Sequence, residues 1–325
     1  MKILLKNQFY QTFTGLSFCL AVIFLSISVI AAQKKNSPPG QAREITVVSE
    51  PNAVVWLDNI RRGATGESGK LTIKSVSNGK HTLRLRAEGF REISQNLLPT
   101  QKGELKIALV KTTDEAEIAF QQAEKLTSSS REKSVEMYEK AIALRPKYAE
   151  AFLGLARVRA DQSNFDKALE AVKQARKLRP GYAEASAVEG RIYVSEGNDE
   201  KAVAAFKRSI AEGRGFQPEA YTGLGLFYKD KAEGFAGAGD FENEKANYLL
   251  AAGHLKTASA QLSGAPDAMV IYQFLGLVYE QMKEFKKAIA VYEDFLRDFP
   301  DSTETTAIRS FIEQLRKQMN GENQE

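Results

Sequence analysis

The segments PKYAEA (residues 146–151) and PGYAEA (residues 180–185) differ at one position and begin 34 residues apart. The same interval separates a set of small residues and a set of aromatic residues. These are Ala141, Ala175 and Ser209, and Tyr148, Tyr182 and Phe216. A constant interval of this length indicates that one supersecondary unit is stacked repeatedly.

Alignment on the prolines gives units at 115–148, 149–182 and 183–216, and the pattern returns at about 269–302. Small residues let paired helices approach closely, and bulky residues fill holes on the neighbouring unit. The residues at these positions are Leu155, Gly190, Tyr193, Ala168, Ala202, Tyr138 and Phe206, and in the last unit Tyr272, Leu275, Gly276, Tyr279, Ala288, Tyr292 and Pro300. The pattern resembles the tetratricopeptide repeat. The resemblance implies an all-α solenoid of about five units over residues 113–302.

The fourth unit departs from this pattern. It begins with Tyr221, Leu224 and Tyr228 in register, but AEGFAGAGDFENEKANY (residues 232–248) then precedes its second helix. The insertion at 230–245 forms either a glycine-rich loop or a longer helix pair. No strand precedes Gly234, Gly237 and Gly239, so they are not a dinucleotide-binding fingerprint, and we predict that they lie in a loop.

The end of the chain, residues 303–325, is predicted to be a capping helix and a tail. Ile308, Phe311, Ile312 and Leu315 fall on one face of a helix over 303–319. A stack of repeats needs such a terminal helix, because its last hydrophobic face would otherwise meet water.

Residues 44–112 have a hydrophobic period of two, which indicates half-buried strands. Leu83 and Leu85 alternate with arginines, and Leu105, Ile107 and Leu109 alternate with Lys106 and Ala108. Asn78-Gly79 between two such runs accepts the positive φ angles of a tight hairpin turn. We therefore predict a multidomain chain, with a small all-β sandwich of about six strands before the all-α solenoid.

The β region resembles the PEGA family. The resemblance rests on VVSEPNAVVWLDN (residues 47–59), on Gly63, on Asn78-Gly79-Lys80-His81 before a strand and on Ala87-Glu88-Gly89-Phe90. Asn52 stands where the family has a glycine, and the loop GATGESGK (residues 63–70) is longer than in the family. The resemblance implies a non-enzymatic, envelope-associated module.

The N-terminus indicates the compartment. Lys2 and Lys6 precede an apolar run from Phe13 to Ala32, which is typical of a secretory leader and is also long enough to span a bilayer. Residues 1–32 are therefore predicted to be a signal peptide or a membrane anchor, and residues 33–43, which contain paired prolines, a linker. We expect an extracytoplasmic protein, periplasmic or at the cell surface.

The charge of +4 hides an asymmetry: residues 33–113 carry +7 and residues 114–325 carry −5. The basic part could contact an anionic envelope polymer or lipid, or it could be an ordinary solvated surface. No nucleic-acid partner is expected.

The sequence contains no constellation that predicts catalysis. The single cysteine, Cys19, lies in the apolar run, and the two histidines do not suggest a metal site. The loop at residues 63–70 has Ala64 where a phosphate-binding loop needs glycine, and it leads into a strand. We expect neither a cofactor nor an enzyme.

The tetratricopeptide resemblance places a binding groove along the first helices of the units. The residues that it predicts to face the groove are Glu150, Leu153, Arg157, Asp161, Glu184, Arg191, Thr222 and Lys229, together with Ala187, Ser195 and Leu226. Arginine suits bidentate contact with carboxylates, so a peptide or an acidic segment of an envelope protein is the expected partner. Glu184 could instead pair with Arg157 or Arg191, which would make the arginines structural. The alternative function is envelope attachment through the basic β domain.

Overall fold

The computed structural model describes residues 43–321, all within one compact unit, Gly40–Glu325. The predicted leader (1–32), the linker up to residue 42 and the last four residues lie outside the described part. None of the helices described in residues 43–321 is both long and apolar enough to cross a membrane.

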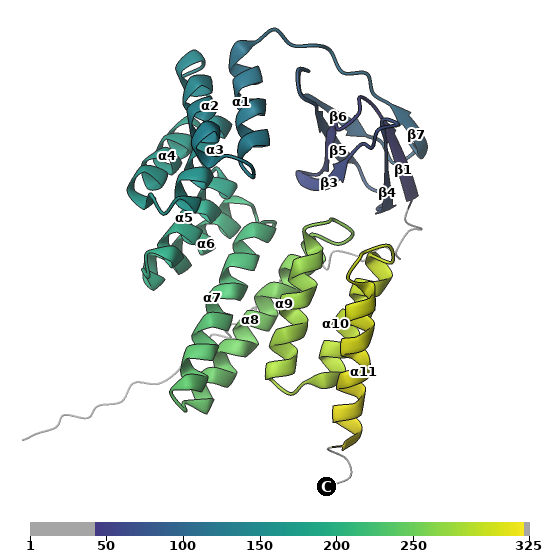
Figure 1. Cartoon of the computed structure of the whole chain (residues 1–325), viewed down its shortest axis with the longest axis vertical. Helices are drawn as coiled ribbons and strands as arrows, with labels where there is room; N and C mark the ends of the chain where they lie inside the picture. Colours follow the sequence, from purple (N-terminus) through teal and green to yellow (C-terminus); the bar gives the residue numbers. More distant parts are fainter. Residues whose placement is uncertain (1–42, 322–325) are drawn as a thin grey trace, which may run out of the picture. The chain divides into compact units, whose positions relative to one another are not determined.

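Seven strands form two sheets, with strand orders β4-β1-β7 and β3-β2-β5-β6 (Figure 1). β7 pairs with β1 in parallel, and the other pairings are antiparallel. The strands are β1 (Arg43–Val48), β2 (Val54–Leu57), β3 (Ile60–Ala64), β4 (Lys70–Val76), β5 (His81–Arg86), β6 (Ile93–Leu97) and β7 (Gly103–Lys106). The predicted small β domain is therefore confirmed, while its identity as a PEGA module stays a prediction.

Alternating apolar residues make the core of the β domain, as a period of two requires. The side chains of Val55, Leu83 and Leu85 have no exposed surface. The domain has one strand more than predicted, because Asp58-Asn59, both with positive φ, forms a two-residue turn that returns β3 along β2.

Eleven helices follow within the described residues, and the first ten form five consecutive antiparallel pairs (Figure 1). They are α1 (Glu115–Leu126), α2 (Arg131–Leu144), α3 (Ala149–Asp161), α4 (Phe165–Leu178), α5 (Ala183–Ser195), α6 (Asp199–Glu212), α7 (Pro218–Gly237), α8 (Phe241–Gln261), α9 (Ala268–Gln281), α10 (Phe285–Asp298) and α11 (Thr305–Gly321). The predicted solenoid is confirmed.

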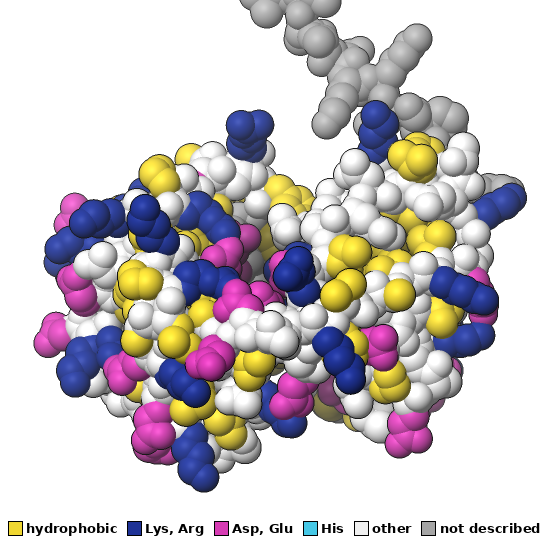
Figure 2. Space-filling view, turned by 90° about the horizontal axis from the view of Figure 1, so that it is seen from above, with side chains coloured by type: hydrophobic (Ala, Val, Ile, Leu, Met, Phe, Trp, Pro, Cys, Tyr) yellow, Lys and Arg dark blue, Asp and Glu magenta, His cyan; other side chains and the backbone are white. Residues whose placement is uncertain are grey.

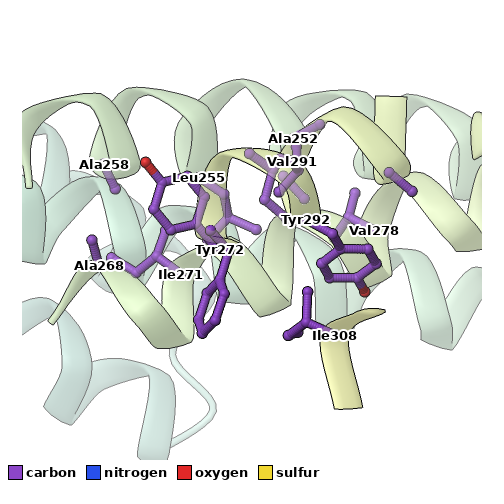
Figure 3. Packing of buried hydrophobic residues seen from close by; sticks show 14 of the residues in the cluster. Ala252, Leu255, Ala258, Ala268, Ile271, Tyr272, Val278, Val291, Tyr292 and Ile308 are labelled. Carbon is purple, nitrogen blue, oxygen red and sulfur yellow. The ribbon is translucent and has the colours of Figure 1, made fainter. Parts of the chain in front are cut away.

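The residues that recur in the sequence lie at equivalent positions of the helix pairs. Pro146, Pro180 and Pro300 each lie two residues beyond the end of a unit's second helix. The small residue of the first helix lies against the aromatic ring of the second, so that a Cβ on Gly276 would come 2.4 Å from the Tyr292 ring. Figure 3 shows Tyr292 close to Val278 and Ile308 within the C-terminal hydrophobic cluster.

The prediction of a loop at the fourth unit's glycines was wrong. Gly234 and Gly237 lie in α7, which has 20 residues and is followed by the 21-residue α8, so the insertion lengthens the helix pair. Only Gly239, with φ +74°, lies in the turn, and the Asp240 side chain caps α8 by accepting a bond from the Asn243 backbone N–H. The two glycines destabilise a helix by about 1 kcal/mol each, and the two flanking helical segments outweigh that cost.

Both ends of the helix stack are covered. At the C-terminal end, α11 buries Ile308, Ile312 and Leu315 in the hydrophobic cluster. At the N-terminal end, the β domain packs on α1, where the buried Gln121 accepts a hydrogen bond from Gly89 N–H (2.9 Å) and donates one to the Phe90 carbonyl (2.8 Å).

Two ion pairs add to this α1 interface. Arg86 pairs with Glu124 at 3.0 Å, and Lys125 pairs with Glu88 at 2.8 Å. Burial raises the pKa of Glu124, although Arg86 opposes the shift. The β domain thus stands where a preceding repeat would otherwise stack on α1.

Candidate binding groove

The first helices of successive units lie side by side, since α3 contacts α5 and α5 contacts α7. This wall brings together Arg157 from α3 and Arg191 from α5. Both bind Glu219 of α7, with distances of 2.7 Å to the Arg157 Nη2 and 3.4 Å to the Arg191 Nη1. Arg191 also lies 3.6 Å from Asp161. We call Arg157, Asp161, Arg191 and Glu219 the groove cluster.

Burial alone would lower the pKa of Arg157, but its ion pair and hydrogen bond with Glu219 raise the pKa above its ordinary value. Arg157 therefore stays charged. The Arg157 side chain is 36% exposed and the Arg191 side chain is 44% exposed. A guanidinium carries five N–H donors, and Glu219 engages a single nitrogen of each.

Glu219 was missed from the sequence. Residues 149–151 and 183–185 both read AEA, and residues 218–220 read PEA, so Glu219 corresponds to Glu150 and Glu184. The interval from Glu184 to Glu219 is 35 residues, because the turn before α7 is one residue longer, and a fixed interval of 34 does not find it.

The other predicted residues lie outside the groove cluster. Glu150 pairs with Arg179, and Leu153 is buried. The Thr222 hydroxyl donates to the Pro218 carbonyl.

Lys229 and Glu184 were also predicted to face the groove, and only Lys229 forms an ion pair among the described residues. Lys229 is held by Glu233 at 2.8 Å and by Asp230 at 3.3 Å. Within residues 43–321, Glu184 forms no ion pair with either arginine, so its predicted pairing is replaced by that of Glu219.

The wall becomes apolar in the last unit. Val270 and Leu277 of α9 occupy the repeat positions held by Glu150 and Arg157 in the second unit, and they are 46% and 36% exposed. Phe311 on α11 is 49% exposed, and its ring lies 6.3 Å from that of Tyr292. The sequence already contains this apolar face, because Val270, Phe274 and Leu277 are spaced so that they fall on one side of a helix.

Acidic and basic side chains are interleaved over much of the face shown in Figure 2. Among residues 43–321, no group of three or more His, Cys, Asp or Glu side chains is arranged to hold a metal ion. The groove therefore offers paired charges and apolar side chains, which suit the binding of a polypeptide segment.

The helical part of the chain is an α-solenoid that contains tetratricopeptide repeats. Models described as "Tetratricopeptide repeat" match residues 124–169, 153–215 and 275–302. The elongated fourth unit lies outside the matched segments. No curated protein matches the chain.

Several solved structures are similar to this chain. The chain is 20% identical to a tetratricopeptide protein from Thermus thermophilus, TTC0263, over 62% of this chain and 98% of that one, with a TM-score of 0.46. It is 20% identical to MamA over 58% and 94% of the two chains (TM-score 0.40), and 16% identical to the type IV pilus biogenesis factor PilW over 65% and 94% (TM-score 0.45). These likenesses concern the fold alone.

Proposed function

We propose that the chain is an exported, non-catalytic scaffold that binds a peptide or a segment of another envelope protein along the wall of α3, α5, α7 and α9. The groove cluster carries this proposal, because two arginines of successive units are held side by side and remain partly open to solvent.

Glu219 prepares the arginines for a ligand carboxylate. It links both guanidinium groups and so holds them in one orientation, which lowers the entropy lost on binding. A carboxylate can use the free N–H donors without displacing Glu219, and Arg157 and Arg191 provide the planar donor pairs that bidentate contacts need. Apolar side chains of the same segment would then lie on Val270 and Leu277.

The export in this proposal rests on the leader. The basic residues and apolar run at the start of the chain are typical of secretion or anchoring. The partner would then be a protein of the envelope.

The experiment is co-purification from envelope extracts with the tagged full chain and with Arg157→Glu/Arg191→Glu. The control is Lys286→Glu/Arg309→Glu, which makes the same change in charge at exposed positions of α10 and α11. We expect the partner to be lost only with the groove variant. Retention with the groove variant would exclude the groove cluster as the site.

A second candidate is attachment to an anionic lipid or polymer through the β domain. On the outer face of β4-β1-β7, the register places Lys70 and Lys106 on either side of Val48, and Lys74 lies on the same face. Lys70 is paired with Glu104, so Lys74 and Lys106 are the cations most open to an anion. Binding through them should weaken steeply as salt is raised, whereas a partly apolar groove interface should be less sensitive.

A further inference from the structure

The β2–β3 hairpin contacts the solenoid far from α1. Ile60, at the start of β3, is buried and belongs to the hydrophobic cluster of α7–α11, not to the core of the β domain. Arg62 on the same strand donates a hydrogen bond of 2.6 Å from Nη1 to the carbonyl of Ser263, in the turn between α8 and α9.

The geometry of this turn favours a cation. Ser263 lies two residues beyond the last residue of α8, where helix carbonyls lack partners and the helix dipole is negative. Gly264 has φ +69°, and a Cβ there would lie 3.8 Å from the Arg62 Nη1, so the guanidinium packs directly on the turn. Burial lowers the pKa of Arg62, and Asp58 partly offsets this effect. The Nε atom of Arg62 is buried and has no hydrogen-bond partner among residues 43–321.

The β domain therefore contacts the solenoid twice, at α1 of the first unit and at the turn after the fourth. The two contacts are unequal. The α1 interface has two hydrogen bonds between the Gln121 side chain and backbone groups of the β domain, and two ion pairs. A short segment joins α1 to the last strand. The contact at Ser263 consists of one charged hydrogen bond and one apolar side chain.

We propose that the β domain is a clasp on the solenoid, hinged at the α1 interface and latched by Ile60 and Arg62 on the α8–α9 turn. The clasp fixes the separation between the first and fourth helix pairs. Because the groove cluster lies on the helices between these contacts, the clasp also sets the spacing of Arg157, Arg191 and Glu219. Opening takes place at the latch, since it has fewer contacts than the hinge.

The experiment measures the distance between two spin labels on the full chain. Cys19→Ser removes the native cysteine, and Lys74→Cys on β4 and Lys286→Cys on α10 provide exposed labelling sites. We expect one narrow distance distribution for the closed clasp. Arg62→Met removes the charged donor and should raise the population at other distances by roughly tenfold.

Arg61→Met is the matched control, because Arg61 is the adjacent, exposed residue of the same strand. It should keep the narrow distribution. Ile60→Ser tests the apolar half of the latch and should act in the same direction as Arg62→Met.

A circular dichroism spectrum with native helical content must accompany each variant, and Ile60→Ser carries the test if Arg62→Met loses helix. A broad distribution for the native chain would overturn the proposal. So would native distributions for both the Arg62 and the Ile60 variants.

Discussion

The contact between Gly276 and Tyr292 allows one substitution to be evaluated quantitatively. In Gly276→Ala the new methyl group would lie 2.4 Å from the Tyr292 Cε1 and Cζ atoms, well inside contact distance. Tyr292 is 4% exposed, and its hydroxyl donates to Glu280 at 2.5 Å, so the ring has little room to move. Overpacking of this kind costs about 1–3 kcal/mol, and the better helix propensity of alanine returns about 1 kcal/mol. The net result should be a loss of roughly 0–2 kcal/mol in the free energy of unfolding.

The same substitution at Gly234 is the control. No atom lies within 4 Å of a Cβ built there, and the residue is helical and exposed. Gly234→Ala should therefore stabilise the chain by about 0.5–1 kcal/mol. Urea unfolding followed by circular dichroism at 222 nm measures both changes. Equal stability of Gly276→Ala and Gly234→Ala would refute the reasoning that small residues are required where helices of one unit approach.

Three further predictions concern the groove cluster and the α1 interface. Glu219→Gln should change the free energy of unfolding by no more than about 1 kcal/mol, because the pairs are partly exposed, and urea unfolding checks it. A loss of several kcal/mol would show that Glu219 is a core structural residue. Gln121→Ala should cost about 1–3 kcal/mol, because two backbone groups of the β domain lose their partner, whereas Gln122→Ala should be nearly neutral in the same assay. The raised pKa of Glu124 favours the protonated form in the folded chain, so its stabilising effect is present at low pH and is lost as pH rises through the folded pKa. Relative to Glu124→Gln, the native chain should lose stability as pH rises above 4.5, the ordinary pKa of the carboxyl group, and through the higher folded pKa. An unchanged difference in urea midpoints over this rise would contradict the shift.

The solenoid could be predicted because each unit repeats the same local requirements. Pro146 and Pro180 mark corners where a helix must end, and Gly190 and Phe206 are a small and a bulky residue that meet, since a Cβ on Gly190 would lie 2.6 Å from that ring. Such short-range constraints leave a visible period in the sequence.

The features that could not be predicted depend on contacts that leave no repeating pattern in the sequence. Glu219 was displaced from the repeat by one residue in the preceding turn. The contact of Arg62 with Ser263 joins residues 201 positions apart, and nothing in either local sequence specifies the other. For Gly234 and Gly237 the local sequence gave a wrong prediction. Glycine disfavours a helix, but the helical segments on both sides keep these residues helical.

In the complex proposed above, the repeat frame would let one wall bind a segment in a single direction. One position of the repeat, immediately after the small residue of the first helix, is Arg157 in the second unit and Arg191 in the third, then Leu226 in the fourth and Leu277 in the fifth. Equivalent positions of successive units thus present charged side chains at one end and apolar side chains at the other. A segment with a carboxylate at one end and apolar residues at the other matches this wall in one orientation only, because reversal would place its carboxylate on leucine and leave it without a hydrogen-bond donor. Direction is therefore encoded by substitutions at one repeat position, with no change in the fold.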